Sequence, residues 1–299
     1  MLDFRLYLVS CTALFCAGAL ASVQWDGQLN AGVLSSNNLS VIELEQISEQ
    51  SDQALTLDAL LNLQWQPSSN SYVDMGASYH NRRFQTLEEY NLQLQSIYLD
   101  TSYVFMPLTL GLNYQHSNAQ LAGQTFLNQQ QVGVYASKVL RRQWYVRAGL
   151  TATDKTFKQF PERNAENLAL QLDLYWFARN RQNVVALSYA HTNEDSDNLR
   201  YSYNANRVDL QFTKQLTFNS TEHKLRLGGR AEQRRYQHFF DSSASSRDDN
   251  QLGLDASLQF FINRHLSLLI ATEWVNTSSN LKDAAYQETS YSLSLRLNF

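Results

Sequence analysis

Hydrophobic and polar residues alternate with a period of two along this chain, in segments that recur from residue 23 to the C-terminus. In one such segment Leu55, Leu57 and Leu61 alternate with Thr56 and Asp58. A period of two is the side-chain period of a β-strand, and segments of about 9 to 11 residues are long enough to cross an outer membrane at a tilt. The pattern therefore predicts an all-β protein whose strands each have one apolar face.

The alternation predicts about 14 strands in a single antiparallel up-and-down barrel, with 12 and 16 as the alternative counts. The chain divides into an expected signal peptide, 1–21, and a barrel, 22–299. Short connections alternate with long ones, which is the layout of an outer-membrane barrel with both termini on the short-turn side. The expected strands are 23–33, 54–66, 71–82, 90–104, 107–117, 128–139, 143–154, 166–177, 182–192, 201–215, 223–235, 250–262, 265–275 and 287–299. The expected long loops are 34–53, 83–89, 118–127, 155–165, 193–200, 236–249 and 276–286.

Residues 1–21 resemble a secretory signal peptide in their order of features. Arg5 precedes an apolar run over residues 6–20, and Ala19-Leu20-Ala21 fits a cleavage site. The alternative is a lipoprotein box that ends at Cys11, after an apolar stretch of only about 7 residues. Both cysteines of the chain, Cys11 and Cys16, lie in this segment, so cleavage after Ala21 leaves no disulfide or thiolate metal site.

Composition excludes several classes of protein. The chain has 299 residues, of which 43% are hydrophobic, and it contains only 3 Pro and 2 Cys, which argues against collagen-like, disulfide-rich and disordered proteins. A net charge of -4 argues against nucleic-acid binding, which needs a basic surface. We expect neither a nucleic-acid partner nor a cofactor or metal.

The polar faces of the strands favour a membrane barrel over a soluble β-sandwich. They carry Gln, Asn, Ser, Gly and Thr with scattered Arg and Asp, whereas a solvated sheet face is usually rich in Lys and Glu. Aromatic residues also gather near strand ends, as in the two girdles of a membrane barrel; examples are Trp25, Trp65, Tyr103, Trp144, Trp176 and Trp274.

The C-terminal segment resembles the terminal β-signal of Gram-negative outer-membrane proteins. It alternates hydrophobic residues and ends in phenylalanine, with Tyr291, Leu293, Leu295, Leu297 and Phe299 as the signal positions. The resemblance implies a bacterial outer-membrane location, contact with membrane lipid and lipopolysaccharide, and insertion by the barrel-assembly machinery. It also implies that the long loops are extracellular and that both termini are periplasmic.

A second resemblance rests on two further stretches, residues 27–38 and 189–203. They include Gly27 to Gly32 followed by Ser35-Ser36-Asn37-Asn38, and Tyr189-Ala190-His191-Thr192-Asn193 followed by Asp197-Asn198, Tyr201 and Tyr203. These look like barrels associated with exopolysaccharide export and like the barrel half of surface-lipoprotein assembly modifiers. The resemblance implies a periplasmic or surface polymer as a partner.

With the apolar rows facing lipid, the charged residues of the opposite rows are expected to line the lumen. Two interpretations remain open: the charges pair across neighbouring strands and brace the wall, or they create a transverse field that selects solutes. For Asp100 the alternation alone does not fix the orientation, because the pattern breaks near Gln95 and Ser96. The expected lining residues are Asp58, Asp74, Asp100, Arg147, Asp173, Arg207, Asp209, Arg226, Arg230, Glu232, Asp255 and Arg296.

These patterns predict a non-enzymatic channel or conduit for hydrophilic solutes or a saccharide polymer. One alternative is an interaction or assembly barrel plugged by its own loops, and the loop over residues 34–53 is the longest candidate to fill the lumen. A less favoured alternative is a barrel lipid hydrolase built on His116 and Ser117, or a similar use of His191. Adjacent residues of a strand point to opposite faces, however, so His116 is badly placed to activate Ser117.

Overall fold

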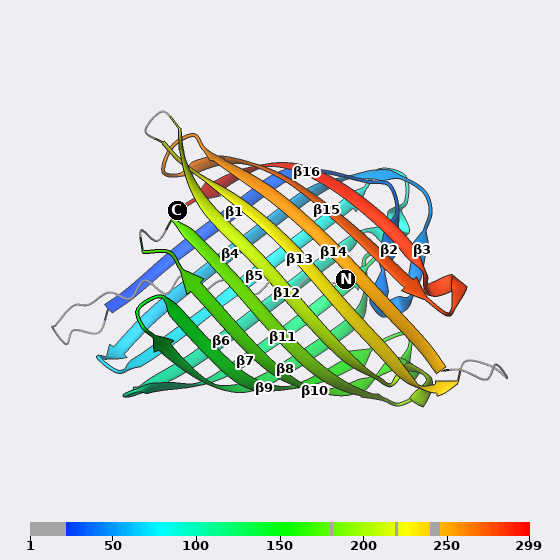
Figure 1. Cartoon of the computed structure of the whole chain (residues 1–299). Helices are drawn as coiled ribbons and strands as arrows, with labels where there is room; N and C mark the ends of the chain where they lie inside the picture. Colours follow the sequence, from blue (N-terminus) through cyan, green and yellow to red (C-terminus); the bar gives the residue numbers. More distant parts are fainter. Residues whose placement is uncertain (1–21, 180–181, 219–220, 240–245) are drawn as a thin grey trace.

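Fourteen antiparallel strands form a closed barrel in the computed structural model, which describes residues 22–179, 182–218, 221–239 and 246–299 (Figure 1). The predicted fold and the count of about 14 strands are confirmed; the expected signal peptide lies outside the described residues. No helix among the described residues is long and apolar enough to cross a membrane. In ring order the wall strands are β1 (Ser22–Ser36), β4 (Asp52–Ser68), β5 (Ser71–Phe84), β6 (Leu92–Phe105), β7 (Leu108–Leu121), β8 (Gln124–Leu140), β9 (Trp144–Phe157), β10 (Ala165–Phe177), β11 (Asn183–Ser196), β12 (Tyr203–Phe218), β13 (Thr221–Phe239), β14 (Ser246–Phe261), β15 (Leu266–Ser279) and β16 (Tyr286–Asn298).

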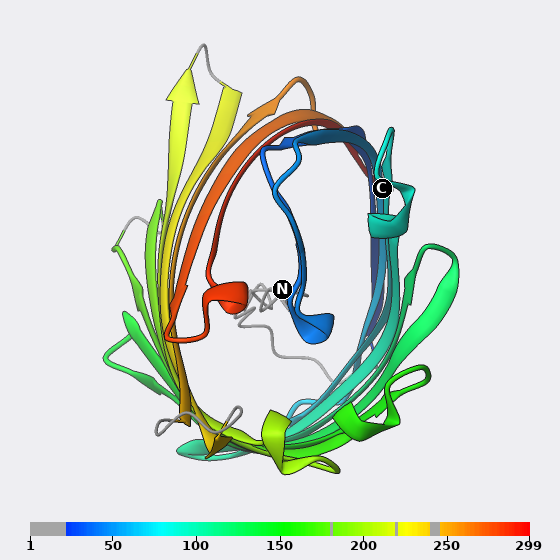
Figure 2. The same cartoon turned by 90° about the vertical axis from the view of Figure 1, so that its right-hand side faces the viewer.

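The first and last strands close the barrel by pairing antiparallel along nine positions, from Gln28 with Asn298 to Ser36 with Ser290. Closure matters because a barrel has no free strand edge, so every backbone donor and acceptor of the wall can be satisfied within the lipid. The end of the chain continues the pairing: Gly27 N donates to Phe299 O at 2.8 Å, and Phe299 N donates to Gly27 O at 3.0 Å. Figure 2 shows the resulting closed, oval wall.

Most strands extend further at the long-loop end than their alternation predicts. β13, for example, reaches Phe239 rather than residue 235, and β11 reaches Ser196 rather than residue 192. At this end both faces of the strands carry polar residues, so the period of two disappears from the sequence although the backbone pairing continues. The alternation therefore marks only the part of each strand that has an apolar outer face, not the full length of the strand.

The predicted long loop at 118–127 is wrong. β7 and β8 continue toward each other and meet in a turn at Ala122 and Gly123, whose φ angles are 50° and 78°. Two consecutive residues with positive φ are typical of a tight hairpin turn whose twist matches that of the flanking strands. The ends of β7 and β8 carry polar residues on both faces, so they lack the alternation of a strand. The sequence analysis therefore predicted a loop there.

The loop expected at 34–53 is largely structured. It contains a hairpin of β2 (Leu39–Val41) and β3 (Gln46–Ser48), joined through the short 3-10 helix η1 (Ile42–Leu44). In Figure 2 this hairpin, drawn in blue, runs inside the oval wall of the barrel. Four further connections at this end carry single-turn 3-10 helices: η2 (Glu88–Tyr90), η3 (Pro161–Arg163), η4 (Leu199–Tyr201) and η5 (Lys282–Ala284).

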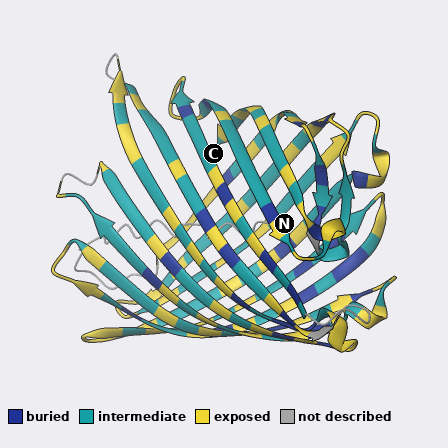
Figure 3. Cartoon of the chain, turned by 45° about the vertical axis from the view of Figure 1, so that its right-hand side comes forward, coloured by how far each residue is buried: buried dark blue, intermediate teal, exposed yellow. Residues whose placement is uncertain are grey.

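Burial in this molecule is inverted relative to a soluble protein. The large apolar side chains of the wall point outward and stay exposed, among them Leu57, Leu110 and Leu170. Buried positions are scattered along the strands and around the hairpin rather than gathered in one central layer (Figure 3). An outward apolar face is the surface that a lipid bilayer covers.

Candidate functional site: the lumen and its hairpin

The inner wall is polar, and all twelve predicted lining residues share it. The parity of each strand and the registers between strands connect them: Asp74 lies opposite Asp100, Arg147 opposite Asp173, and Asp209 opposite Arg230. The same registers connect Arg207 with Glu232, and they place Asp58, Arg226, Asp255 and Arg296 on this wall as well. The outward face of the apolar residues was therefore enough to predict that these charged residues face inward.

Asp100 is inward, although the alternation breaks beside it. Its carboxylate accepts a hydrogen bond from Tyr135 Oη at 2.6 Å and lies 4.0 Å from Arg147 Nη2. The break has a specific cause: Leu92 and Leu94 of the same strand also point inward, where they pack against the apolar cluster beside the hairpin. They therefore resemble lipid-facing residues in the sequence while lying on the opposite face.

Tyr135 was missed by the sequence analysis, and it organises this part of the wall. Its ring lies over Gly111 of the neighbouring strand, at a place where a Cβ atom would collide with it. The guanidinium of Arg147 covers the ring at 3.6 Å from its centroid, within the range of a cation–π contact. Glycine at position 111 thus allows a tyrosine to lie flat and to hold both Arg147 and Asp100.

Several predicted charges pair with neighbours on the wall. Arg207 donates from Nε and Nη2 to the two carboxylate oxygens of Asp209, both at 2.7 Å, and lies 4.0 Å from Glu232. Arg230 lies 3.7 Å from Glu273, two strands away. These contacts between neighbouring charges on β12 to β15 agree with the bracing interpretation.

Asp58 and Asp173 are held in different ways. Asp58 lies 3.0 Å from His80 Nδ1 of the adjacent strand, a partner that the sequence analysis did not assign. Asp173 is buried and accepts a hydrogen bond from Ser188 Oγ at 2.6 Å. Asp173 therefore supports the wall, whereas Asp58 and His80 remain more than a third exposed and face the lumen.

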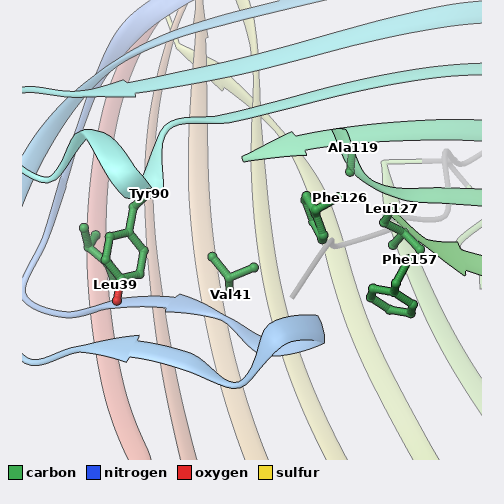
Figure 4. Packing of buried hydrophobic residues seen from close by; sticks show 7 residues of the cluster. All are labelled: Leu39, Val41, Tyr90, Ala119, Phe126, Leu127 and Phe157. Carbon is green, nitrogen blue, oxygen red and sulfur yellow. The ribbon is translucent and has the colours of Figure 1, made fainter. Parts of the chain in front are cut away.

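Apolar contacts fix one side of the hairpin to the wall. Leu39 and Val41 belong to a buried cluster with Tyr90, Phe126 and Phe157, which come from η2, β8 and β9 (Figure 4). Burying side chains of this size stabilises the docked hairpin by about 1.5 to 3 kcal/mol each. The cluster is the apolar core of the region, and it lies inside the barrel rather than between two sheets.

Charged contacts fix the tip of the hairpin to two other places. The Glu45 carboxylate accepts a hydrogen bond from Arg163 Nη2 of η3 at 2.8 Å and another from Arg247 Nη1 of β14. Arg247 is buried, with Nη2 lying 2.7 Å from Asp249, and its guanidinium lies 4.4 Å from the centroid of Tyr236. The residues of this clamp lie where the sequence analysis expected loops, so alternation could not assign them to the inner wall.

The base of the hairpin is also anchored. Glu288 of β16 accepts hydrogen bonds from Ser36 Oγ at 3.0 Å and from Ser40 Oγ at 2.7 Å. The hairpin is therefore held at its base, along its apolar side and at its tip. A small cavity of about 40 Å³ separates it from the wall, lined by Glu45, Ile47 and residues of β13 to β16.

Acidification is expected to release the tip of the hairpin. Burial by itself would raise the pKa of Glu45, but Arg247 and Arg163 outweigh it and hold the pKa below the usual 4.5. A lowered pKa means that the clamp contributes its full stability above about pH 4.5 and loses it as pH falls through the lowered value. We expect the single-channel current of the wild type to become noisier over that acidic range.

The Glu45→Gln variant should show such current noise already at neutral pH and respond less to acid, because it lacks the carboxylate. Lys214→Gln on the outer wall removes a charge without touching the hairpin and serves as the control. Equal pH profiles for the wild type and Glu45→Gln would contradict this role of Glu45.

The residues considered for hydrolysis do not form a catalytic arrangement. Ser117 points inward and contacts Ser96 Oγ at 2.8 Å, whereas His116 lies on the outer face of the same strand. His191 is also outward and contacts Asn206 at 3.0 Å. No group of three or more metal-ligating side chains occurs in the part of the chain that the structure describes.

Comparison with known proteins identifies the fold. No protein-family model matches the chain, and no curated protein matches it in sequence. The in-vitro folded form of OmpT, an outer membrane protein of Vibrio cholerae, superposes with a TM-score of 0.56 at 8% identity, over 95% of this chain and 99% of that one. An anion-selective porin from Comamonas acidovorans gives a TM-score of 0.54 at 9% identity, over 94% and 100% of the two chains. The chain has the fold of an outer-membrane β-barrel. At these identities the likeness establishes the fold alone.

Proposed function

We propose that this protein is an outer-membrane channel that passes small hydrophilic solutes through the barrel lumen. The observation that carries the proposal is the solvent exposure of charged side chains on the inner wall. Asp58, His80 and Arg207 keep 37%, 35% and 31% of their side-chain surface exposed, although they face only the lumen. Because lumen-facing residues meet no lipid, this exposed surface belongs to a water-filled interior.

Charge is unevenly distributed around that interior, which supports selective passage. β6 and β13 are seven strands apart in a ring of fourteen and therefore form opposite walls. Asp100 on β6 and Arg226 on β13 each lie five residues from the short-turn ends of their strands, at Phe105 and Thr221. Opposite charges on opposite walls of the lumen produce a transverse field that orients polar solutes.

The proposal includes the location and biogenesis that the sequence implies. The apolar outer face contacts membrane lipid and lipopolysaccharide, the long loops are extracellular, and both termini are periplasmic. Tyr291, Leu293, Leu295 and Leu297 are exposed on the outer face of β16, where the barrel-assembly machinery can recognise them before closure. A saccharide polymer is the alternative cargo of the same conduit.

Cysteine labelling tests the proposal, because residues 22–299 contain no native cysteine. Ser78 faces the lumen, and its neighbour Ala77 faces outward on the same strand. A charged methanethiosulfonate reagent should reduce the single-channel conductance of Ser78→Cys in a planar bilayer and leave that of Ala77→Cys unchanged. A folded protein that shows no conductance would contradict the proposed channel function.

A second candidate function is a plugged barrel that presents its loops to a partner. The hairpin favours it, because Glu45 and the cluster around Val41 hold this segment inside the lumen from more than one side. Such a barrel would conduct negligibly, and the bilayer measurement therefore separates the two functions.

A further inference from the structure

Three aromatic rings lie in a row on the inner wall at the short-turn end. Tyr145 is the second residue of β9, and Tyr175 and Phe177 are the last two inward residues of β10. Tyr145 and Tyr175 are register partners, and their ring centroids lie 5.7 Å apart. The centroids of Tyr175 and Phe177 lie 6.5 Å apart, with an angle of 15° between the ring planes. All three residues are partly exposed, and we call them the aromatic track.

The aromatic track faces the lumen, whereas aromatic residues at this level of a membrane barrel usually face the lipid interface. Tyr145 shares its face with Arg147, and Tyr175 shares its face with Asp173, because each pair is two residues apart on one strand. The adjacent residue Trp144 faces outward and is exposed on the lipid side. Lipid does not cover aromatic surface inside a water-filled lumen, and exposed apolar surface of this kind marks a binding site.

The hairpin is fixed at the other end of the wall. Its apolar side contacts Phe126 and Phe157, at the long-loop ends of β8 and β9. Tyr145 lies 12 residues from Phe157 along β9, which corresponds to about 40 Å at the usual rise of a strand. Docking of the hairpin therefore does not cover the aromatic track.

Polar groups lie beside the aromatic track on the next strands. The register continues from Tyr175 through Ala186 of β11 to Gln211 of β12. Tyr175 and Gln211 are thus two strands apart, about 10 Å at the usual strand spacing, and the side chain between them is a single methyl group. Gln211 Nε2 donates a hydrogen bond to Thr213 Oγ1 at 3.2 Å, so an amide and a hydroxyl lie together here. An aromatic surface therefore faces a hydrogen-bonding edge across one small side chain.

The charges nearest to the aromatic track are compensated within the wall. The guanidinium of Arg147 covers the ring of Tyr135 and lies 4.0 Å from the Asp100 carboxylate. Asp173 is buried and accepts a hydrogen bond from Ser188 Oγ at 2.6 Å. A solute at the track therefore meets aromatic rings, an amide and a hydroxyl next to balanced charges. This combination favours an uncharged solute that has both apolar and hydroxyl-bearing surfaces.

We propose that the aromatic track binds the pyranose rings of uncharged saccharides that pass through the channel. A pyranose ring has an apolar face of C–H groups and a rim of hydroxyls. The face packs on an aromatic ring, while the hydroxyls form hydrogen bonds with Gln211 and Thr213. The nearly parallel rings of Tyr175 and Phe177 offer successive faces to neighbouring units of a saccharide chain. Mainly aromatic surfaces with few polar groups are typical of ligand sites in the mouths of β-barrels. The inference rests on the proposed function and assigns it a class of solute.

Cellopentaose, an uncharged linear oligosaccharide, is the probe for this site. Added to the electrolyte, it should reduce the single-channel current of the wild type in a saturable way. The double variant Tyr145→Ala/Tyr175→Ala should raise the half-blocking concentration about tenfold, because it removes two stacking contacts. Tyr145→Phe/Tyr175→Phe keeps both rings and should stay within about twofold of the wild type. The matched control is Trp144→Ala/Trp176→Ala, which removes two rings from the outer face of the same strands and should leave the half-blocking concentration unchanged.

A binding measurement separates this inference from the proposed function. Saturation-transfer NMR of cellopentaose with the folded protein in detergent should detect binding by the wild type, the phenylalanine variant and the tryptophan control. The affinity of the tyrosine-to-alanine variant should be about tenfold lower. If the bilayer is silent but this difference in affinity appears, the channel fails and the site stands. If the wild type conducts but cellopentaose does not block it, or if the tyrosine-to-alanine variant binds cellopentaose as the wild type does, the proposed site is contradicted.

Discussion

Replacing residues 38–49 with a short glycine-serine linker is expected to raise single-channel conductance about two- to threefold. A barrel of 14 strands has a backbone diameter of roughly 25 to 30 Å, and a two-stranded hairpin with its side chains occupies about 10 Å of that width. Removing the hairpin widens the aqueous cross-section, and the current through a water-filled pore follows that area. The measurement is the current amplitude of single insertions in a planar bilayer.

A graded control accompanies the deletion. The double variant Leu39→Ala/Val41→Ala keeps the length of the hairpin but weakens its contacts with Tyr90 and Phe126. Its mean conductance should lie between those of the wild type and the deletion, with larger current fluctuations, because the hairpin then undocks and docks again. A deletion variant that folds and conducts as the wild type does would show that the hairpin does not set the aperture.

Substituting Gly27 with leucine is expected to destabilise barrel closure by about 1 kcal/mol, the low end of the cost of overpacking, because the side chain of Phe299 is exposed and can turn aside. The ring of Phe299 lies directly over Gly27, so that any Cβ atom at position 27 collides with it, and Trp25 lies beside the ring at 6.2 Å between centroids. The larger side chain must displace the ring from the position where the last residue of the chain pairs with β1. Urea unfolding of the folded protein in detergent or lipid vesicles gives the free energy of unfolding.

A double-mutant cycle identifies the cause of that loss. Gly27→Ala should cost about 0.5 to 1 kcal/mol in the wild type and close to nothing in the Phe299→Ala background, because the colliding ring is then absent. Gly229→Ala is the matched control: position 229 also faces outward in a wall strand, and a Cβ atom there meets only Leu254 Cδ2 at 3.6 Å. Equal costs of Gly27→Ala in both backgrounds would show that Phe299 and Gly27 do not act together.

The sequence by itself predicted a barrel of about 14 strands, the lipid-facing rows of those strands and the inward face of twelve charged residues. All three follow from the period of two, which is a local property: once one residue of a strand faces lipid, the face of every other residue in that strand is settled. Even Asp100, beside the break in alternation, follows the parity of β6.

Only the tertiary structure decided which charges meet and where residues 38–49 lie. Glu45, Arg163 and Arg247 are far apart in the sequence, and closure of the ring and the inward fold of the hairpin bring them together. His80 opposite Asp58 and Tyr135 over Gly111 likewise depend on the register between strands. Alternation specifies the face of a side chain but carries no information about its height relative to the next strand, and that height decides every contact within the lumen.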